Sequence, residues 1–173
     1  MLKKFLRFLG AVDGEDRQMW FLLGVGAFMG FFLASYQVGS ESLFIQTLGE
    51  KYLAESFFVT GALGLLSSVV YVYLQKKIRF SRLVIGNAVV ITLFVSGLRL
   101  AFEFVEIGDK ESEFSLLPFL LFVMMGPMTS LLLLGFWGLF GRIFDTRQTK
   151  RLIGSVDTGQ LVATIIAFFS IPL

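Results

Sequence analysis

Long apolar stretches constrain the fold of this chain more than any other feature. Four stretches of roughly 18 to 25 residues are long enough as helices, at about 1.5 Å per residue, to cross a hydrocarbon core of about 30 Å. A fifth stretch reaches only about 24 Å by the same rise and just fails to cross. The predicted spans are residues 19–38, 57–74, 83–102, 116–140 and 158–173. They predict an all-α integral membrane protein with about five transmembrane helices.

The composition agrees with a membrane protein and excludes much of enzymology. Of the 173 residues, 55% are hydrophobic and 16% charged, and the mean hydropathy is +0.79, which is too apolar for a water-soluble domain of this size. The chain has no Cys and no His, so it lacks thiolate nucleophiles and the usual zinc and haem ligands. No phosphate-loop or nucleophile-elbow spacing occurs. We expect no enzymatic activity, no metal, no cofactor and no nucleic-acid partner.

The basic residues predict the orientation of the chain, because Lys and Arg in short loops stay on the cytoplasmic side. One side of the predicted topology holds twelve of them: Lys3, Lys4, Arg7, Arg17, Lys76, Lys77, Arg79, Arg82, Arg142, Arg147, Lys150 and Arg151. The other side holds two, Lys51 and Lys110, in acidic loops where Ser40 and Ser112 are expected to face outward. The N-terminus is therefore predicted in the cytoplasm of a multi-pass protein, and a bacterial inner membrane is the expected location.

The first residues have the pattern of a helix that lies in the lipid headgroups. Over residues 1–12 the apolar and basic side chains fall on different helical faces, and no small-residue cleavage site follows. Residues 13–16, Asp-Gly-Glu-Asp, then break this helix and offer caps for the first span. The expected organisation is an interfacial helix and linker over 1–18 and a transmembrane helical domain over 19–173.

Two features within the spans predict how the helices pack. Gly26, Gly30 and Ala34 form a stripe of small residues at i, i+4 and i+8, which favours close helix contact; a second interpretation is that glycine lets the helix rock during a transport cycle. Pro127 removes one backbone hydrogen bond in the middle of the fourth span, so we expect a kink there.

Charged residues within or beside the spans have competing interpretations. Arg99 is the one basic residue predicted inside a span, where it either pairs with Glu103 and reaches the outer surface or contacts an anion in a polar cavity. Asp157, Thr158 and Gly159 spell the aspartic-protease triplet, but no second such triplet exists and Asp157 is interpreted as the cap of the fifth span.

The segment after the fourth span resembles one known family. Phe136-Trp137, then the basic pair Lys150-Arg151, then Gly159 leading into the fifth span are similar to the loop between the fourth and fifth helices of the ATP/ADP translocase (nucleotide transporter) branch of the major facilitator superfamily. Thr149 stands where that family has Ala, and Val156-Asp157 departs from its glycine-rich stretch. The specific resemblance covers about 25 residues.

The resemblance implies most of the N-terminal half of a facilitator-type protein, with further helices beyond Leu173. It implies a secondary transporter of an anionic or nucleotide-like metabolite, with Arg99, Lys150, Arg151 and Gln160 as candidate substrate-binding residues. A carboxylate of the family's fourth helix falls at about Met125, however, where no acidic residue lies. The alternative is a transport-inactive structural or sensory module, or a subunit of a larger complex. Expected partners are the bilayer, anionic lipid headgroups and other membrane helices or subunits.

Overall fold

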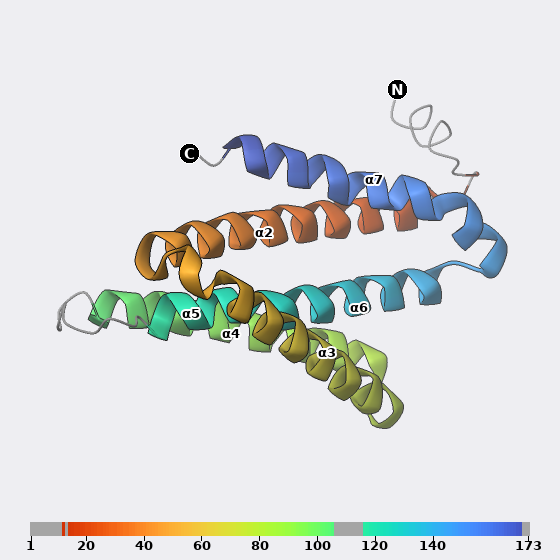
Figure 1. Ribbon diagram of the computed structural model, residues 1–173. Coiled ribbons are helices and arrows are strands. Elements are labelled where there is room, and N and C mark those ends of the chain that lie inside the picture. Colours follow the sequence, from red (N-terminus) through yellow and green to blue (C-terminus); the bar gives the residue numbers. More distant parts are fainter. Residues whose placement is uncertain (1–11, 13, 106–115, 171–173) are drawn as a thin grey trace. The chain divides into compact units, whose positions relative to one another are not determined.

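The structure is a computed structural model that describes residue 12, residues 14–105 and residues 116–170. Within these ranges the chain is helical apart from short connections and contains no strand (Figure 1). The elements are α2 (Asp16–Leu48), the 3₁₀ helix η1 (Glu50–Tyr52), α3 (Leu53–Lys77), α4 (Phe80–Val105), α5 (Leu116–Val123), α6 (Met125–Ile143) and α7 (Thr146–Ser170). Five helical stretches are long and apolar enough to cross a membrane, which confirms the predicted all-α fold. The predicted interfacial helix lies, except for Val12, outside the described residues.

The first span continues well past its predicted end at Val38. α2 has 33 residues and is therefore about 50 Å long. Ser40, expected in an outer loop, is instead fully buried within the helix, and its hydroxyl donates to the carbonyl of Gln37 (3.0 Å). The prediction was wrong here because it followed local polarity, whereas the apolar side chains of Phe44 and Leu48 bury themselves in a core further along the helix.

The fifth span begins at Thr146, twelve residues before its predicted start at Thr158. With 25 residues it is about 37 Å long and can cross a membrane, so the expectation that it falls short was wrong. Asp145 caps the new start: its carbonyl accepts from the N–H of Thr149 (2.8 Å), and its own N–H donates to Oε1 of Gln148 (2.9 Å), which is the backbone half of a capping box. Asp157 lies inside α7 and is not a cap.

The fourth span is divided close to the proline that predicted a kink. α5 ends at Val123 and α6 begins at Met125, with a turn at Met124. Pro127 has no N–H to donate to the carbonyl of Val123, and its ring crowds that carbonyl. The helical hydrogen bonds on either side are still formed: the N–H of Met124 donates to the carbonyl of Leu120 (3.1 Å), and the N–H of Met128 donates to the carbonyl of Met124 (3.1 Å). The interruption is thus confined to the turn before the proline.

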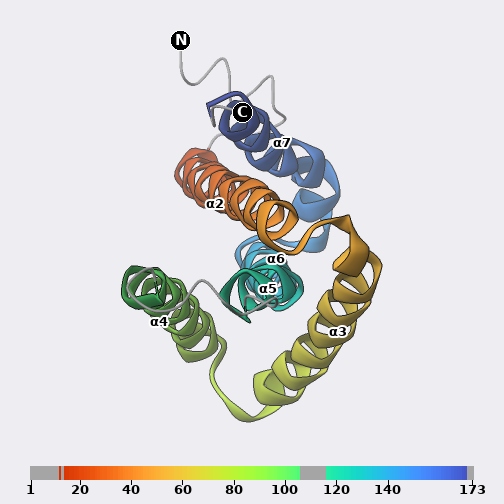
Figure 2. The ribbon, with the colours of Figure 1, turned by 60° about the vertical axis from the view of Figure 1, so that its left-hand side comes forward.

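The chain divides into two compact units. The first unit comprises residues 1–36 and 134–173, and the second comprises residues 37–133. In the first unit α7 runs beside the first part of α2, as both ribbon views show (Figures 1 and 2). The two helices are parallel, because Leu23 lies against Gly159 and Gly30, further along α2, lies against Thr164.

The second unit is built around α5 and the beginning of α6, on which α3 packs. Its core contains Phe44, Leu48, Phe122 and Val123. The rings of Phe44 and Phe122 have centroids 4.5 Å apart, and Phe57 of α3 meets Phe122 edge-on at 5.0 Å. These aromatic contacts bring the end of α2, the start of α3 and α5 together.

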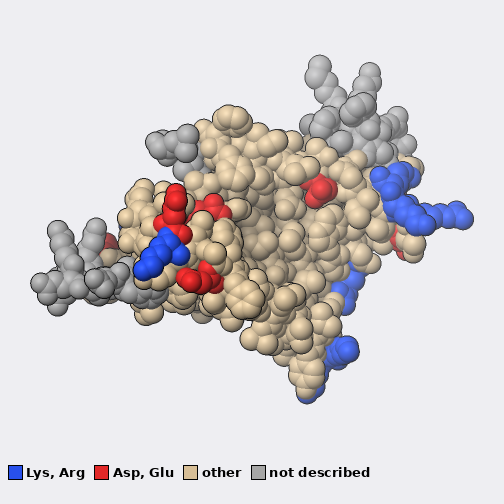
Figure 3. Space-filling view, in the orientation of Figure 1, with Lys and Arg blue, Asp and Glu red and all other residues tan. Residues whose placement is uncertain are grey.

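Charge is sorted along α3 within this second unit. Glu50 of η1 and Glu55 lie at the beginning of the helix, whereas Lys76 and Lys77 lie in its last turn. Figure 3 shows the acidic side chains, with a basic one among them, near the connection from α2 to α3, and basic side chains at the far end of α3. This separation is the pattern from which the sequence predicts that the α3–α4 connection faces the cytoplasm.

Candidate functional site

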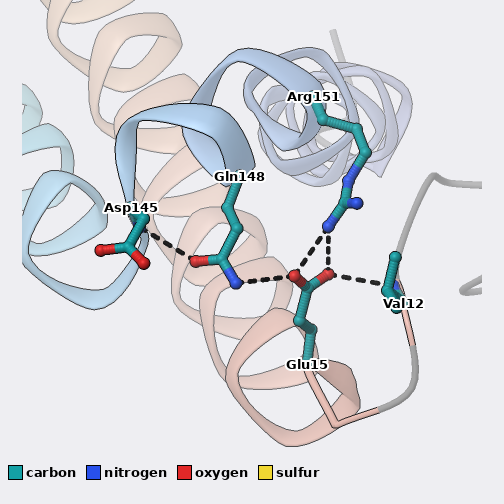
Figure 4. A network of polar contacts seen from close by, with 5 residues as sticks. All are labelled: Val12, Glu15, Asp145, Gln148 and Arg151. Atoms are coloured by element: carbon teal, nitrogen blue, oxygen red, sulfur yellow. Dashed lines mark hydrogen bonds and ion pairs between the residues drawn. The ribbon is translucent and has the colours of Figure 1, made fainter.

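The carboxylate of Glu15 joins the beginnings of α2 and α7 in a polar network (Figure 4). Arg151 donates from Nη2 to Oε1 (2.7 Å) and Oε2 (2.5 Å) of Glu15, and Nε2 of Gln148 donates to Oε1 (2.7 Å). The N–H of Val12 donates to Oε2 (3.0 Å), which the turn at Gly14, with φ of 102°, permits. We call Glu15, Gln148 and Arg151 the Glu15 network.

The surroundings of Glu15 favour its charged form. The N–H of Val12 is the largest cause that lowers the pKa of this carboxyl below 4.5, burial opposes it, and Gln148 and Arg151 lower it further. The side chain of Glu15 is only 11% exposed, whereas that of Arg151 is 39% exposed. The network therefore holds an ionised carboxylate between two helix starts, at the ends of the spans rather than inside them.

Two of the candidate substrate-binding residues lie at this end of α7. Arg151 is engaged by Glu15, while Lys150, its neighbour, is exposed. Sequence reasoning treated the acidic residues before α2 only as caps and so missed Glu15. The available signal was the Asp145-Thr146-Arg147-Gln148 sequence, which starts α7 early enough to bring Arg151 to the level of Glu15.

Small residues make the contact between α2 and α7. A Cβ built on Gly30 would collide with the backbone oxygen of Gln160 and lie 3.0 Å from Oγ1 of Thr164. That hydroxyl donates to the carbonyl of Gly30 (3.4 Å). A Cβ on Gly26 would lie 3.3 Å from the ring of Phe136, and Ala34 is 3% exposed. Gly26 and Gly30 of the predicted small-residue stripe thus face other helices of the first unit, and Ala34 is buried as well.

Gln160, another candidate site residue, lies in this helix contact. Its Oε1 atom is buried and has no hydrogen-bond partner among the described residues. Its backbone oxygen and Cγ lie against Gly30. The side chain thus offers an unused acceptor within the membrane-spanning part of the first unit.

Asp157 occupies a position in α7 that the sequence prediction did not anticipate. It is eleven residues from the start of the helix at Thr146, or about 16 Å along its axis. Its neighbour Val156 is buried, and the carbonyl of Val156 would lie 3.7 Å from a Cβ on Gly26, a residue well inside the first span. Asp157 is therefore a partly buried carboxyl group well inside a helix that is long and apolar enough to cross a membrane.

Arg99 lies in the last third of α4, in the second unit. Its side chain is exposed, and together with Leu43, Phe102 and Glu103 it lines an open cavity of about 400 Å³. Arg99 and Glu103 share this cavity, but the described residues include no ion pair between them. The arrangement places a guanidinium and a carboxylate beside an apolar wall, toward the acidic end of the unit.

A second close helix crossing, between α3 and α6, was missed from the sequence. A Cβ on Gly126 would collide with the backbone oxygen of Thr60, and one on Gly64 would lie 3.3 Å from Gly126 and from Oγ of Ser130. A cavity of about 330 Å³ adjoins this crossing and includes Met125 in its lining. Small residues at i, i+4 and i+8 along α3, starting at Thr60, were the signal that could have found it.

No site for a metal ion is formed by groups of carboxylates in the described part of the chain. Comparisons with protein-family models, with curated proteins and with solved structures found no match for this chain. The geometry of the charged residues is therefore the basis for assigning a function.

Proposed function

We propose that this chain is part of a facilitator-type secondary transporter of an anionic or nucleotide-like metabolite. It is further proposed to lie in a bacterial inner membrane with its N-terminus in the cytoplasm. The observation behind the proposal is the position of Asp157: it lies inside α7, next to Val156, whose carbonyl packs against Gly26 of α2. A charged side chain within a membrane helix is costly, up to about 2.5–3.5 kcal/mol at the helix centre on insertion scales and less toward its ends, so such residues are retained chiefly for function.

A second charged residue, Arg99 of α4, supports the same proposal. Arg99 is exposed to an open cavity and has no ion-pair partner among the described residues, which leaves its guanidinium available to an anion. Arg151, in contrast, already has a carboxylate partner. We therefore assign substrate contact to Arg99 in the second unit. Within the first unit we assign coupling to Asp157 and a helix-fixing role to Arg151.

The test is uptake of labelled ATP and of labelled phosphate into vesicles that contain the full-length protein. Asp157→Asn keeps the size of the side chain and removes its charge, and Asp145→Asn is a matched control at the exposed start of α7. We expect Asp157→Asn to reduce uptake at least tenfold and Asp145→Asn to change it less than twofold. Equal uptake by the parent and Asp157→Asn, with both proteins folded, would rule out the assigned role.

A second candidate function is a transport-inactive membrane module, which one observation favours. A groove of about 370 Å³ runs along α2 and α7, and small residues such as Gly24, Ala27 and Ala163 line it together with Trp20. Such surfaces allow another membrane helix to approach closely. A photo-crosslinker at Ala27 that captures one defined membrane protein in cells, in a protein that takes up neither probe, would favour this function over transport.

A further inference from the structure

We propose that a cavity at the beginning of α2 binds the headgroup of an anionic phospholipid. The cavity has a volume of about 380 Å³ and is lined by Arg17, Gln18, Phe21 and Ile143. These residues come from the first turns of α2 and from the end of α6, both within the first unit. We call it the Arg17 cavity, and its assignment does not depend on transport.

The polar side of the Arg17 cavity matches a phosphodiester. The side chains of Arg17 and Gln18 are both exposed, and neither makes a hydrogen bond or ion pair with another described residue. A guanidinium offers a planar fork of N–H donors that binds two phosphate oxygens at once. The Gln18 amide adds a neutral donor, which suits the remaining phosphate or glycerol oxygens.

The apolar side of the cavity distinguishes a lipid from a soluble anion. Phe21, one turn further along α2, is 55% exposed, and Ile143 provides a second apolar wall. Trp20 lies beside them on α2 and is 39% exposed, as expected for an aromatic residue at the level of the headgroups. A phospholipid places its phosphate against Arg17 and the first part of its acyl chains against Phe21.

Among the described residues that line the cavity, Arg17 is the charged one. The carboxylate of Glu15 is occupied by Arg151 and Gln148, and Asp16 is not among the lining residues. Arg142 donates to the carbonyl of Gly138 (3.5 Å) and adds positive charge at the same helix end. The positive charges of Arg17 and Arg142 therefore attract an anionic headgroup, which agrees with the negative surface of the cytoplasmic leaflet that the predicted orientation places at this end.

The test measures lipid binding to the purified protein in detergent, with phosphatidylglycerol, phosphatidylcholine and soluble glycerol phosphate as the three probes. We expect Arg17→Gln to weaken phosphatidylglycerol binding about fivefold, which is the effect of one basic residue near the surface. Arg147→Gln, an exposed residue outside the cavity, is the matched control and should change binding less than twofold. Arg17→Lys keeps the positive charge but not the planar fork of donors. Its loss of phosphatidylglycerol binding should therefore lie between the losses in Arg17→Gln and Arg147→Gln.

Three outcomes would overturn the proposal. Equal losses in Arg17→Gln and Arg147→Gln would show diffuse attraction to the basic surface. Equal binding of phosphatidylcholine and phosphatidylglycerol would show that the cavity does not recognise the negative charge of the headgroup. Glycerol phosphate binding as tightly as the lipid, with no effect of Phe21→Ala on either, would show an anion site that takes no lipid. Melting curves of each variant separate these results from misfolding.

Discussion

Adding one methyl group at Gly30 should weaken the contact between α2 and α7. A Cβ there collides with the backbone oxygen of Gln160 and lies 3.0 Å from Oγ1 of Thr164, and a backbone oxygen cannot rotate away. The helices must separate instead, which costs about 1–3 kcal/mol by comparison with overpacked cores. The separation also weakens the hydrogen bond from Thr164 to Gly30, and such bonds contribute about 0.6 kcal/mol between membrane helices.

Gly24 provides the matched control for this change. It lies on the same helix, and a Cβ there meets nothing within 4 Å. Gly24→Ala and Gly30→Ala gain the same helix propensity, about 1 kcal/mol, so their difference isolates the cost of the collision. At about 2–4 °C per kcal/mol for a chain of this size, we expect Gly30→Ala to melt about 2–12 °C below Gly24→Ala in detergent.

Thermal unfolding followed by circular dichroism measures this difference, and a larger side chain extends the series. Gly30→Leu should lower the melting temperature further and reduce the yield of folded protein, because it pushes the two backbones further apart. If Gly30→Ala melts at or above the temperature of Gly24→Ala, α2 and α7 do not make the contact described here.

Three further predictions follow from other features. Glu15→Gln should destabilise the protein by about 1 kcal/mol at pH 7; because the pKa of Glu15 is lowered in the folded state, the melting difference from the parent should persist above about pH 4.5 and vanish as the pH falls through the lowered pKa. Cysteine at Lys51, exposed in η1, should react with an impermeant thiol reagent from outside, and cysteine at Thr146 should not; the reverse labelling would contradict the predicted orientation. Gly126→Ala should destabilise the second unit, whereas Gly61→Ala, where a Cβ meets nothing, should not; equal melting would exclude the close crossing at Thr60.

The existence of the helices was predictable because long apolar runs have few alternatives in a membrane. The small-residue stripe was equally readable, since Gly26 and Gly30 recur at the helical spacing that faces one neighbour. Both predictions depend on the chain's own periodicity and need no knowledge of distant contacts. The equivalent stripe from Thr60 on α3 could have been found in the same way.

Helix boundaries were harder, because burial decided them against local polarity. The polar residues around Ser40 suggest a loop, yet α2 continues because Phe44 and Leu48 find a core with Phe122 that lies far away in sequence. That core cannot be read from the residues flanking Ser40. The Arg17 cavity likewise depends on Ile143 lying near Arg17, which only the folded chain shows.

The early start of α7 links the boundary error to the functional argument. Interpreted as a basic loop, residues 141–153 leave Asp157 at a helix start, where a carboxylate is an ordinary cap. Once Asp145 and Gln148 form the cap instead, the helix carries Arg151 to Glu15 and Asp157 to the depth of Gly26. One shift of about three turns thus moves Asp157 from the expected start of the helix to its interior. It also gives Arg151 a carboxylate partner, which is why the proposed anion contact is assigned to Arg99 rather than to Arg151.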